Sequence, residues 1–589
     1  MPDARTLRSP EAVIADMTLS EKIGQMTQAS NDSIEPQEVA DHFIGSVLSG
    51  GNGNPSPNSP EAWRDMVGEF IDASLDTRLG IPAIYGIDAV HGHSNVRGAT
   101  IFPHNIGLGS IGDEQLVRRI GQVTATEMLA TGVQWAFAPT VAVAQDIRWG
   151  RTYESYGRDA GLVARLGAAL VAGLATPDHG KGRVLACAKH FAGDGAAEWG
   201  TVDRKPWMQW WDGWGDSWNI DQGDTAISED LLRDVHLRPY ARAIDAGVMS
   251  VMASYSSWNG VKMHAHAHLL TTTLKGELGF EGFVVSDWMG VDQIADSYEE
   301  SVIAAVNAGI DMVMVPLDWQ RFIDVMHDAV TLGRIPMARI DDAVRRILRS
   351  KSWLTNGNAS AEAPLLSVAG SHEHRKVAAE AARRSAVLLK DDRMLPLDRA
   401  SRVLVAGRAA DDIGLQCGGW TVGWQGSAGP VTPGTTLLEA LERQFRGNVT
   451  FSASGEPDHG EPWDVGIVCV AEEPYAEGPG DHAVPSVRDE DQRVFEQARA
   501  RCRSVVLIVY SGRPVIIPDM IRRSDAVVAA WLPGSEATEL PDLLVGSSPF
   551  EGCLTQPWPA SIGDLDPGST TNQFPVGHGL RLPDMEMRP

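Results

Sequence analysis

The segment at 282–291, GFVVSDWMGV, places the carboxylate Asp287 directly after a short apolar run. The run at 283–285 has no polar alternation, which is typical of a strand covered on both faces in a parallel sheet. Ligands bind and reactions occur at the C-terminal ends of such strands. Asp287 is therefore a candidate catalytic or binding carboxylate, and a helix N-cap is the structural alternative.

Other polar side chains occupy the same kind of position. Asp88, Lys189, His190 and Tyr255 each lie at or beyond the last apolar residue of a predicted strand, and Arg151 lies in a loop shortly after one. Carboxylates and cations gathered at one sheet edge can bind polar ligands and move protons. The pattern predicts a site at the C-terminal mouth of a parallel sheet.

The elements that position these residues are apolar runs with helix-like stretches between them. The alternation predicts a parallel βα barrel or an open sheet. The runs are HFIGSVLSG from 42, PAIYGIDAV from 82, VQWAFAPTVAV from 133, VLACAKHF from 184, VMSVMASY from 248, GFVVSDW from 282 and IDMVMVP from 310.

A second α/β pattern follows a stretch rich in Asn, Ser, Ala and Gly that begins near Ser350 and reads as a linker. We predict a catalytic domain at 1–350, a linker at 351–372 and a second domain at 373–589. The strand candidates of the second domain are SRVLVAG from 401, VGIVCVAEE from 465, SVVLIVYSG from 504 and AVVAAWLPG from 526.

Composition narrows the classes of partner. With 589 residues and a formal charge of −27, the chain is too long for one core and disfavours nucleic acid and anionic lipid as partners. Neutral substrates fit better. The five scattered cysteines show no metal spacing and read as reduced thiols. Without a visible signal segment we expect a cytoplasmic enzyme, although a trimmed secreted or periplasmic form would look the same.

Seven motifs in order along the chain resemble glycoside hydrolase family 3, in its two-domain exo-acting β-glucosidase and β-glucan exohydrolase branch. They are YGIDAVHGHSNVRGATIFPHNIGLG from 85, RWGRTYESYGRD from 148, KHFAGDG from 189, MASYSSWNGVKMH from 252, SDWMGV from 286, CGGWTVGWQG from 417 and EEPYAEGPGD from 472. The resemblance implies an N-terminal (β/α)8-type TIM barrel followed by an α/β sandwich domain. It also implies retaining hydrolysis of terminal β-glucosyl residues from β-glucosides or short β-glucans, without a cofactor.

The resemblance gives the two carboxylates their roles. Asp287 matches the nucleophile that forms a glycosyl-enzyme, which a second carboxyl group helps to hydrolyse. In this branch the second carboxyl group comes from a loop of the second domain, here AEEPYAEG, which offers Glu472, Glu473 and Glu477. Glu477 occupies the matching place and is the predicted acid/base, with a solvated loop acid as the alternative.

Further residues match sugar ligands of the family. They are Asp88, Arg151, Lys189, His190, Met252 and Tyr255 around the terminal sugar, and Trp288 and Trp424 as aromatic walls for the next sugar. Arg151 and Lys189 are also cations that could keep Asp287 ionised. Indole faces suit the C–H faces of glucose, while simple packing is the alternative for each tryptophan.

Two histidine sets invite a metal hypothesis. HGH at 91–93 and HAHAH at 264–268 place ligands on alternate residues. We favour no metal, because hydrolysis through two carboxylates needs none.

The chain departs from the family pattern in three places. Met289 and Gln222 stand where relatives carry acids, and a Trp-rich segment at 199–218 looks like an insertion. The insertion could wall the cleft or act as a surface flap or homodimer contact.

Three rival functions remain. A β-N-acetylhexosaminidase of the same family is disfavoured by Asp194, which stands where that branch has histidine. A β-xylosidase is harder to separate, although Asp88 and YGIDAVHGH favour glucose. A non-catalytic sugar-binding scaffold is opposed by the presence of both carboxylates.

Overall fold

The computed structural model describes residues 9–179, 182–204, 217–358, 364–457, 462–565 and 571–582. These residues form two compact units, each made of segments that are separate in sequence. The first unit comprises 1–99, 117–143 and 163–370, and the second comprises 100–116, 144–162 and 371–589. The central part of the Trp-rich segment, the middle of the predicted linker and both ends of the chain lie outside the described residues.

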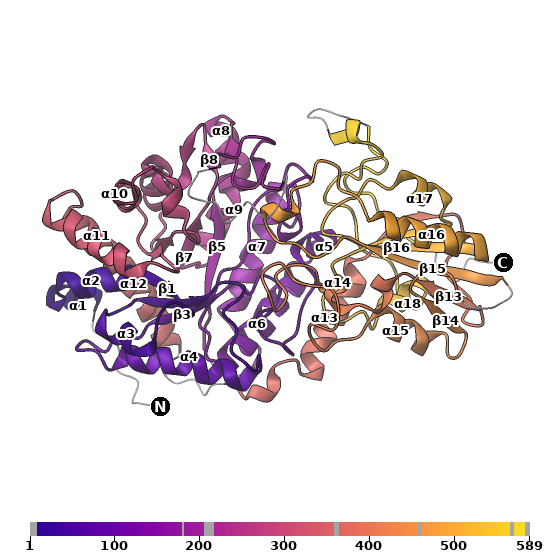
Figure 1. Cartoon of the computed structure of the whole chain (residues 1–589), viewed down its shortest axis with the longest axis horizontal. Helices are drawn as coiled ribbons and strands as arrows, with labels where there is room; N and C mark the ends of the chain where they lie inside the picture. Colours follow the sequence, from indigo (N-terminus) through magenta and orange to yellow (C-terminus); the bar gives the residue numbers. More distant parts are fainter. Residues whose placement is uncertain are drawn as a thin grey trace. The chain divides into compact units, whose positions relative to one another are not determined.

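The first unit contains eight parallel strands in the order β10-β7-β5-β4-β3-β2-β1-β11 (Figure 1). A bridge between Val285 and Met312 brings the two outer strands together, so the sheet is a nearly closed barrel. The strands are β1 (Thr27–Ser30), β2 (Ser46–Ser49), β3 (Ile84–Ile87), β4 (Trp135–Ala136), β5 (Leu185–Phe191), β7 (Ser250–Ala253), β10 (Phe283–Val285) and β11 (Val313–Met314). The predicted TIM barrel is confirmed.

Helices follow most of these strands, as the alternating pattern predicts. Their starts carry the expected caps: Thr18 and Glu21 form a capping box on α2, and Ser297 caps α10. The helices are α1 (Pro10–Asp16), α2 (Leu19–Gln25), α3 (Pro36–Asp41), α4 (Pro60–Leu75), α6 (Glu114–Ala130), α7 (Ala160–Leu174), α8 (Glu229–Leu231), α9 (Arg238–Asp245), α10 (Tyr298–Ala308), α11 (Trp319–Thr331) and α12 (Met337–Asn358).

Seven of the barrel strands coincide with the apolar runs of the sequence, and β1 does not. Its sequence is TQAS, yet all four residues are buried. Its polar side chains donate hydrogen bonds to neighbouring elements: Gln28 Nε2 donates to Ser46 Oγ at 2.9 Å, and Thr27 Oγ1 donates to Ile23 O at 2.9 Å. A buried strand made of such polar residues has no apolar run by which the sequence could reveal it.

The second unit is built on a six-stranded sheet in the order β12-β17-β16-β15-β13-β14. Only β12 runs antiparallel to its neighbour. Figure 1 shows α16 and α17 on one face and α15 and α18 on the other, which confirms the predicted α/β sandwich. The strands are β12 (Val387–Asp391), β13 (Val403–Ala406), β14 (Val449–Ser452), β15 (Trp463–Ala471), β16 (Cys502–Tyr510) and β17 (Ala526–Trp531).

The helices of the second unit include one from early in the chain, because 100–116 belongs to this unit. They are α5 (Asn105–Ile111), α13 (His372–Ser385), α14 (Ile413–Cys417), α15 (Leu437–Gln444), α16 (Asp489–Arg501), α17 (Pro518–Arg523) and α18 (Leu540–Leu544). The predicted domain boundaries at 350 and 373 stay a prediction. Among the described residues, no helix combines the length and the apolar content that crossing a bilayer requires.

Candidate active site

The barrel strands end where the sequence places the candidate residues. Asp88 directly follows β3, and Lys189 and His190 are the residues before the last residue of β5. Tyr255 follows β7, and Asp287 follows β10. Parallel register brings the C-terminal ends of these strands to one edge of the barrel. The structure therefore gathers the charged candidates of the first unit on that edge.

Asp287 is buried, and its two carboxylate oxygens have different neighbours. Its Oδ1 accepts the backbone N–H of Trp288 at 2.8 Å, and its Oδ2 lies 3.6 Å from His190 Nε2. The other ring nitrogen of His190 lies 2.9 Å from Asp194 Oδ2. An ionised carboxylate only accepts hydrogen bonds, so Asp194 orients His190 toward the nucleophile candidate.

Lys189 lies beside Asp88, and its predicted influence on the charge of Asp287 stays a prediction. Its Nζ lies 3.5 Å from Asp88 Oδ1, and both side chains are almost fully buried. A neighbouring lysine and aspartate present both a donor and acceptors to a polar ligand. This pair suits recognition of sugar hydroxyls, which both give and receive hydrogen bonds.

The backbone of the nucleophile turn is anchored by two side chains of the preceding segment. The N–H of Asp287 donates to His264 Nε2 at 3.0 Å, and the Tyr255 hydroxyl donates to Trp288 O at 2.6 Å. Burial lowers the pKa of His264 to about 3, so the ring is neutral and its Nε2 can accept. The sequence presented His264 only as a metal candidate, and its role as an acceptor depends on tertiary contacts that no motif shows.

The other residues of the first unit that the sequence singles out are Met252, Trp288, Met289 and Gln222. Met252 is buried in β7 and pairs with Val285 of β10. The Trp288 ring packs on Gly50, where an added Cβ would overlap it. Met289 adopts a left-handed conformation with φ 50°, and Gln222 with φ 71° accepts a bond from Gln293 at 3.1 Å.

In the second unit, Arg151 joins two carboxylates. Its Nε and Nη2 lie 2.8 and 2.9 Å from the two oxygens of Glu154, and its Nη1 donates to Glu477 Oε1 at 3.0 Å. Arg151 and Glu154 are almost fully buried, and the Trp420 indole N–H donates to Glu154 at 3.1 Å. The two-pronged contact fixes the guanidinium plane, so Arg151 meets Glu477 in a defined orientation.

The three acids of the AEEPYAEG loop have distinct environments. Glu472 is buried and bonded to Arg513 Nε, the N–H of Gly512 and the Tyr475 hydroxyl at 2.9–3.1 Å. Glu473 is half-exposed and paired with Arg408 and Arg488. The Glu477 side chain is 14% exposed. Glu472 anchors the loop and Glu473 lies on the surface, whereas Glu477 contacts Arg151 from a nearly buried position.

Glu477 also has an unusual backbone. Its φ of 58° and ψ of −147° lie in a region that residues with a side chain rarely adopt. Such conformations persist only where surrounding contacts enforce them, and they concentrate at functional sites. Trp424, the second predicted aromatic wall, lies in the loop at 418–426 and accepts the N–H of Trp420 at 2.9 Å.

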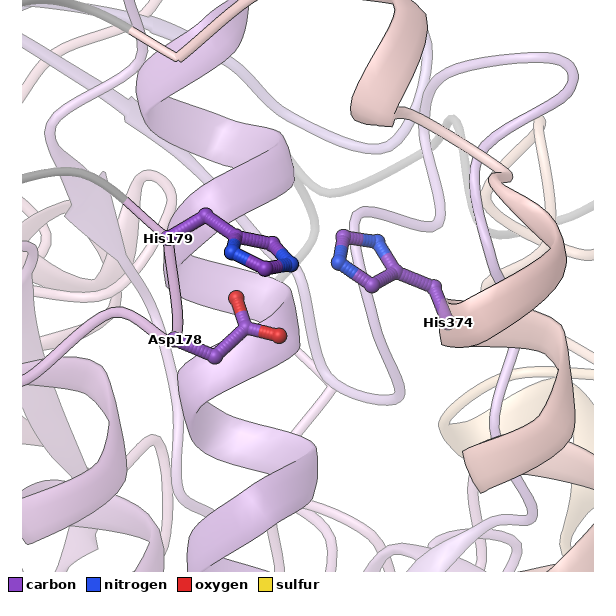
Figure 2. Close-up of side chains that lie close together, drawn as sticks. All are labelled: Asp178, His179 and His374. Carbon is purple, nitrogen blue, oxygen red and sulfur yellow. The ribbon is translucent and has the colours of Figure 1, made fainter.

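The metal hypothesis gains no support from the described residues. Neither histidine set belongs to a group of three potential ligands there. Figure 2 draws Asp178 and His179, which follow α7 in the first unit, together with His374 from α13 of the second. Asp178 is bonded to Thr126 of its own unit. Because the three residues come from different units, no metal site is assigned to them.

Comparison with known proteins identifies the family of the chain. Residues 18–350 match the Glycosyl hydrolase family 3 N terminal domain and residues 386–582 the corresponding C-terminal domain. A lysosomal beta glucosidase of Dictyostelium discoideum is 31% identical, over 96% of this chain and 75% of that protein. A beta-xylosidase of Formosa agariphila is 28% identical, over 84% and 71%.

Solved structures extend the likeness to the whole fold. A variant of an exo-1,3/1,4-beta-glucanase from a Pseudoalteromonas species is 39% identical with a TM-score of 0.88, covering 97% of this chain and 94% of that one. A beta-glucosidase from Listeria innocua, at 24% identity and a TM-score of 0.81, shares the fold over 97% of this chain and 82% of its own. The chain belongs to glycoside hydrolase family 3 and is a glycoside hydrolase.

Proposed function

We propose that this chain is a retaining, exo-acting β-glucosidase that releases terminal non-reducing β-D-glucosyl residues from β-glucosides and short β-glucans. The observation that carries the proposal is Asp287, a buried carboxylate at the end of β10 whose backbone and side chain are both fixed. The names of the relatives, beta-glucosidase and exo-1,3/1,4-beta-glucanase, support the substrate class.

In the proposed mechanism Asp287 attacks the anomeric carbon while Glu477 donates a proton to the departing glycosidic oxygen. A glycosyl-enzyme ester and a free alcohol result. Glu477, now a carboxylate, then takes a proton from water, which attacks the anomeric carbon and releases Asp287. Each carboxylate ends the cycle in its starting state.

Substrate recognition is assigned to the charged pairs at the barrel mouth. Asp88 accepts hydrogen bonds from hydroxyls far from the reacting carbon, and Lys189 beside it donates to ring hydroxyls. His190, oriented by Asp194, lies close enough to Asp287 to contact the sugar at the reacting carbon. Trp288 and Trp424 offer apolar faces to the next sugar.

The test is covalent trapping with a 2-deoxy-2-fluoroglucosyl fluoride. Fluorine destabilises the transition state for breakdown, so a retaining enzyme accumulates one label per chain. Intact mass followed by peptide mapping should place the label on Asp287, and Asp287→Ala should take none. Turnover of aryl glucosides without a label, or a label elsewhere, would reject Asp287 as the nucleophile.

The acid/base role is tested separately. Glu477→Ala should lose several orders of magnitude on substrates with poor leaving groups, keep much of its rate on dinitrophenyl glucosides and form glucosyl azide when azide is added. Equal losses on all leaving groups, with no azide product, would remove Glu477 from the mechanism.

A β-xylosidase is the second candidate, because a named beta-xylosidase is among the relatives. The same aryl leaving group on glucose and on xylose separates the two: we expect the larger kcat/KM on the glucoside. The cytoplasmic location stays a prediction; relatives named after the lysosome and the periplasm make cell fractionation its test.

A further inference from the structure

The loop at 418–426 is joined to the loop of Glu477 by one side chain of the second unit. Gln425 Nε2 donates to Ala476 O at 3.1 Å, and the N–H of Ala476 donates to Gln425 Oε1 at 3.0 Å. The amide thus pairs with both backbone groups of one residue, as a neighbouring strand would. A reversed amide would face donor with donor and acceptor with acceptor, so the orientation is fixed.

Ala476 is the residue directly before Glu477, whose backbone is strained. A residue with a side chain keeps such a conformation only where contacts on either side enforce it. After Glu477, the N–H of Gly480 donates to its carbonyl at 2.9 Å. Before it, the Tyr153 hydroxyl holds Tyr475 O at 2.6 Å, and Gln425 holds Ala476.

We propose that Gln425 is a positioning residue for proton transfer: by pairing with Ala476 it keeps Glu477 in its left-handed conformation, aligned for the glycosidic oxygen. The inference rests on the proposed function, in which Glu477 is the acid/base. Gln425 directly follows Trp424, so the loop that would contact the aglycone also holds the group that would protonate it.

This role has a kinetic signature. Misplacing a general acid slows departure of poor leaving groups, which need the proton, and spares good ones, which do not. A displacement of about 1 Å can cost up to about a hundredfold in rate. Loss of the second unit's structure would instead lower every rate together.

The first variant is Gln425→Met, which keeps the length of the side chain and removes both bonds. We expect kcat/KM to fall about tenfold to a hundredfold on alkyl and phenyl glucosides and to change less than about threefold on dinitrophenyl glucoside. The matched control is Gln444→Met, a half-buried glutamine of α15 in the same unit, which should change neither rate.

The second variant, Gln425→Glu, adds a pH readout. An ionised carboxylate accepts from Ala476 but faces its carbonyl with an oxygen, whereas a protonated carboxyl can donate to that carbonyl as the amide does. We expect its rate relative to wild type on phenyl glucoside to rise as the pH falls through the titration of the new carboxyl group. A purely structural role would leave this ratio flat.

The outcomes separate the two proposals. If Glu477→Ala shows leaving-group dependence and azide rescue while both Gln425 variants match wild type, or lose equally on all leaving groups, the inference on Gln425 is wrong. If Glu477→Ala itself lacks that signature, the proposed acid/base fails first. Thermal unfolding of each variant identifies losses that come from instability.

Discussion

The backbone N–H of Asp287 bears on its carboxylate, because the direction of the side chain depends on how the turn is fixed. His264 supplies the acceptor for that N–H and is completely buried. Burial lowers the pKa of His264 to about 3, so it stays neutral at any pH where the enzyme is expected to work. Its accepting Nε2 requires the proton to lie on Nδ1.

Replacing His264 should therefore impair the nucleophile. His264→Phe keeps a ring but leaves the buried N–H without its acceptor, at a cost of about 1–3 kcal/mol. We expect kcat/KM to fall about tenfold or more on all aryl glucosides alike, because attack rather than protonation is affected, while His264→Gln, whose amide oxygen can accept, keeps more activity. Steady-state kinetics and the rate of fluoroglucosyl labelling measure this.

The control for this prediction is His236, another buried histidine of the first unit, whose pKa burial lowers to about 4. His236→Phe should leave labelling of Asp287 unchanged. Equal labelling rates for wild type and His264→Phe would contradict the positioning role.

At the scale of elements, most of the site residues that the sequence predicts in the first unit lie at the ends of barrel strands. Asp88, Lys189, His190 and Asp287 are predictable because each follows an apolar run, and parallel register then brings them together. Their partners are not predictable in the same way. Asp194, Glu154, His264 and Gln425 act through contacts whose geometry depends on loop conformations, and a single sequence carries no signal for those.

Loop packing leads to a prediction at Gly150, in the segment before Arg151. A Cβ added there would overlap Glu477 O and lie 2.8 Å from Gly480, so Gly150→Ala must displace the Glu477 loop. We expect losses that grow as the leaving group becomes poorer, as for Gln425→Met. Kinetics on a series of aryl glucosides measure this, and a uniform loss would contradict it.

Gly68 in α4 provides the control. Nothing lies within 4 Å of a Cβ added at Gly68, and alanine is favoured over glycine inside a helix. Gly68→Ala should keep full activity and raise the free energy of unfolding by about 0.5–1 kcal/mol.

For the molecule as a whole, buried neutral histidines set part of the response of stability to pH. Burial lowers the pKa of His93 to about 3, against an ordinary value of 6.5. Between these pH values His93 is protonated in the unfolded chain and neutral in the folded chain, so unfolding becomes more favourable as the pH falls below 6.5. The contribution is absent above that pH, where both states are neutral.

His93→Gln should reduce this dependence. The amide can keep the contact to Thr131, which lies 2.7 Å from His93 Nε2, but it does not titrate. We expect the loss in free energy of unfolding between pH 7.5 and pH 5.0 to be about 2 kcal/mol smaller than in wild type. Chemical denaturation at the two pH values measures it, and identical losses would contradict the assignment.

Local sequence patterns could not predict which segments of the chain belong to which unit. Ser535 N–H donates to Ile101 O at 3.0 Å, and Tyr153 bonds to Tyr475, so segments early in the chain complete a unit whose sheet comes at its end. Local periodicity predicts strands and helices, but it contains no information on partners hundreds of residues away.

This membership has a consequence for how the chain is made. As the protein leaves the ribosome, 100–116 and 144–162 emerge long before the part of the second unit at 371–589, and they carry side chains such as Ile101, Phe102, Trp149 and Tyr156 that are almost fully buried in the finished fold. A nascent chain that has just completed the first unit therefore carries two apolar segments that still lack their packing partners at 371–589, and we expect chaperones to bind them. If only the residues after 370 were exchanged with those of a relative, 100–116 and 144–162 would have to pack on a sheet of different sequence. We therefore expect functional hybrids when 100–116 and 144–162 are exchanged together with the residues after 370.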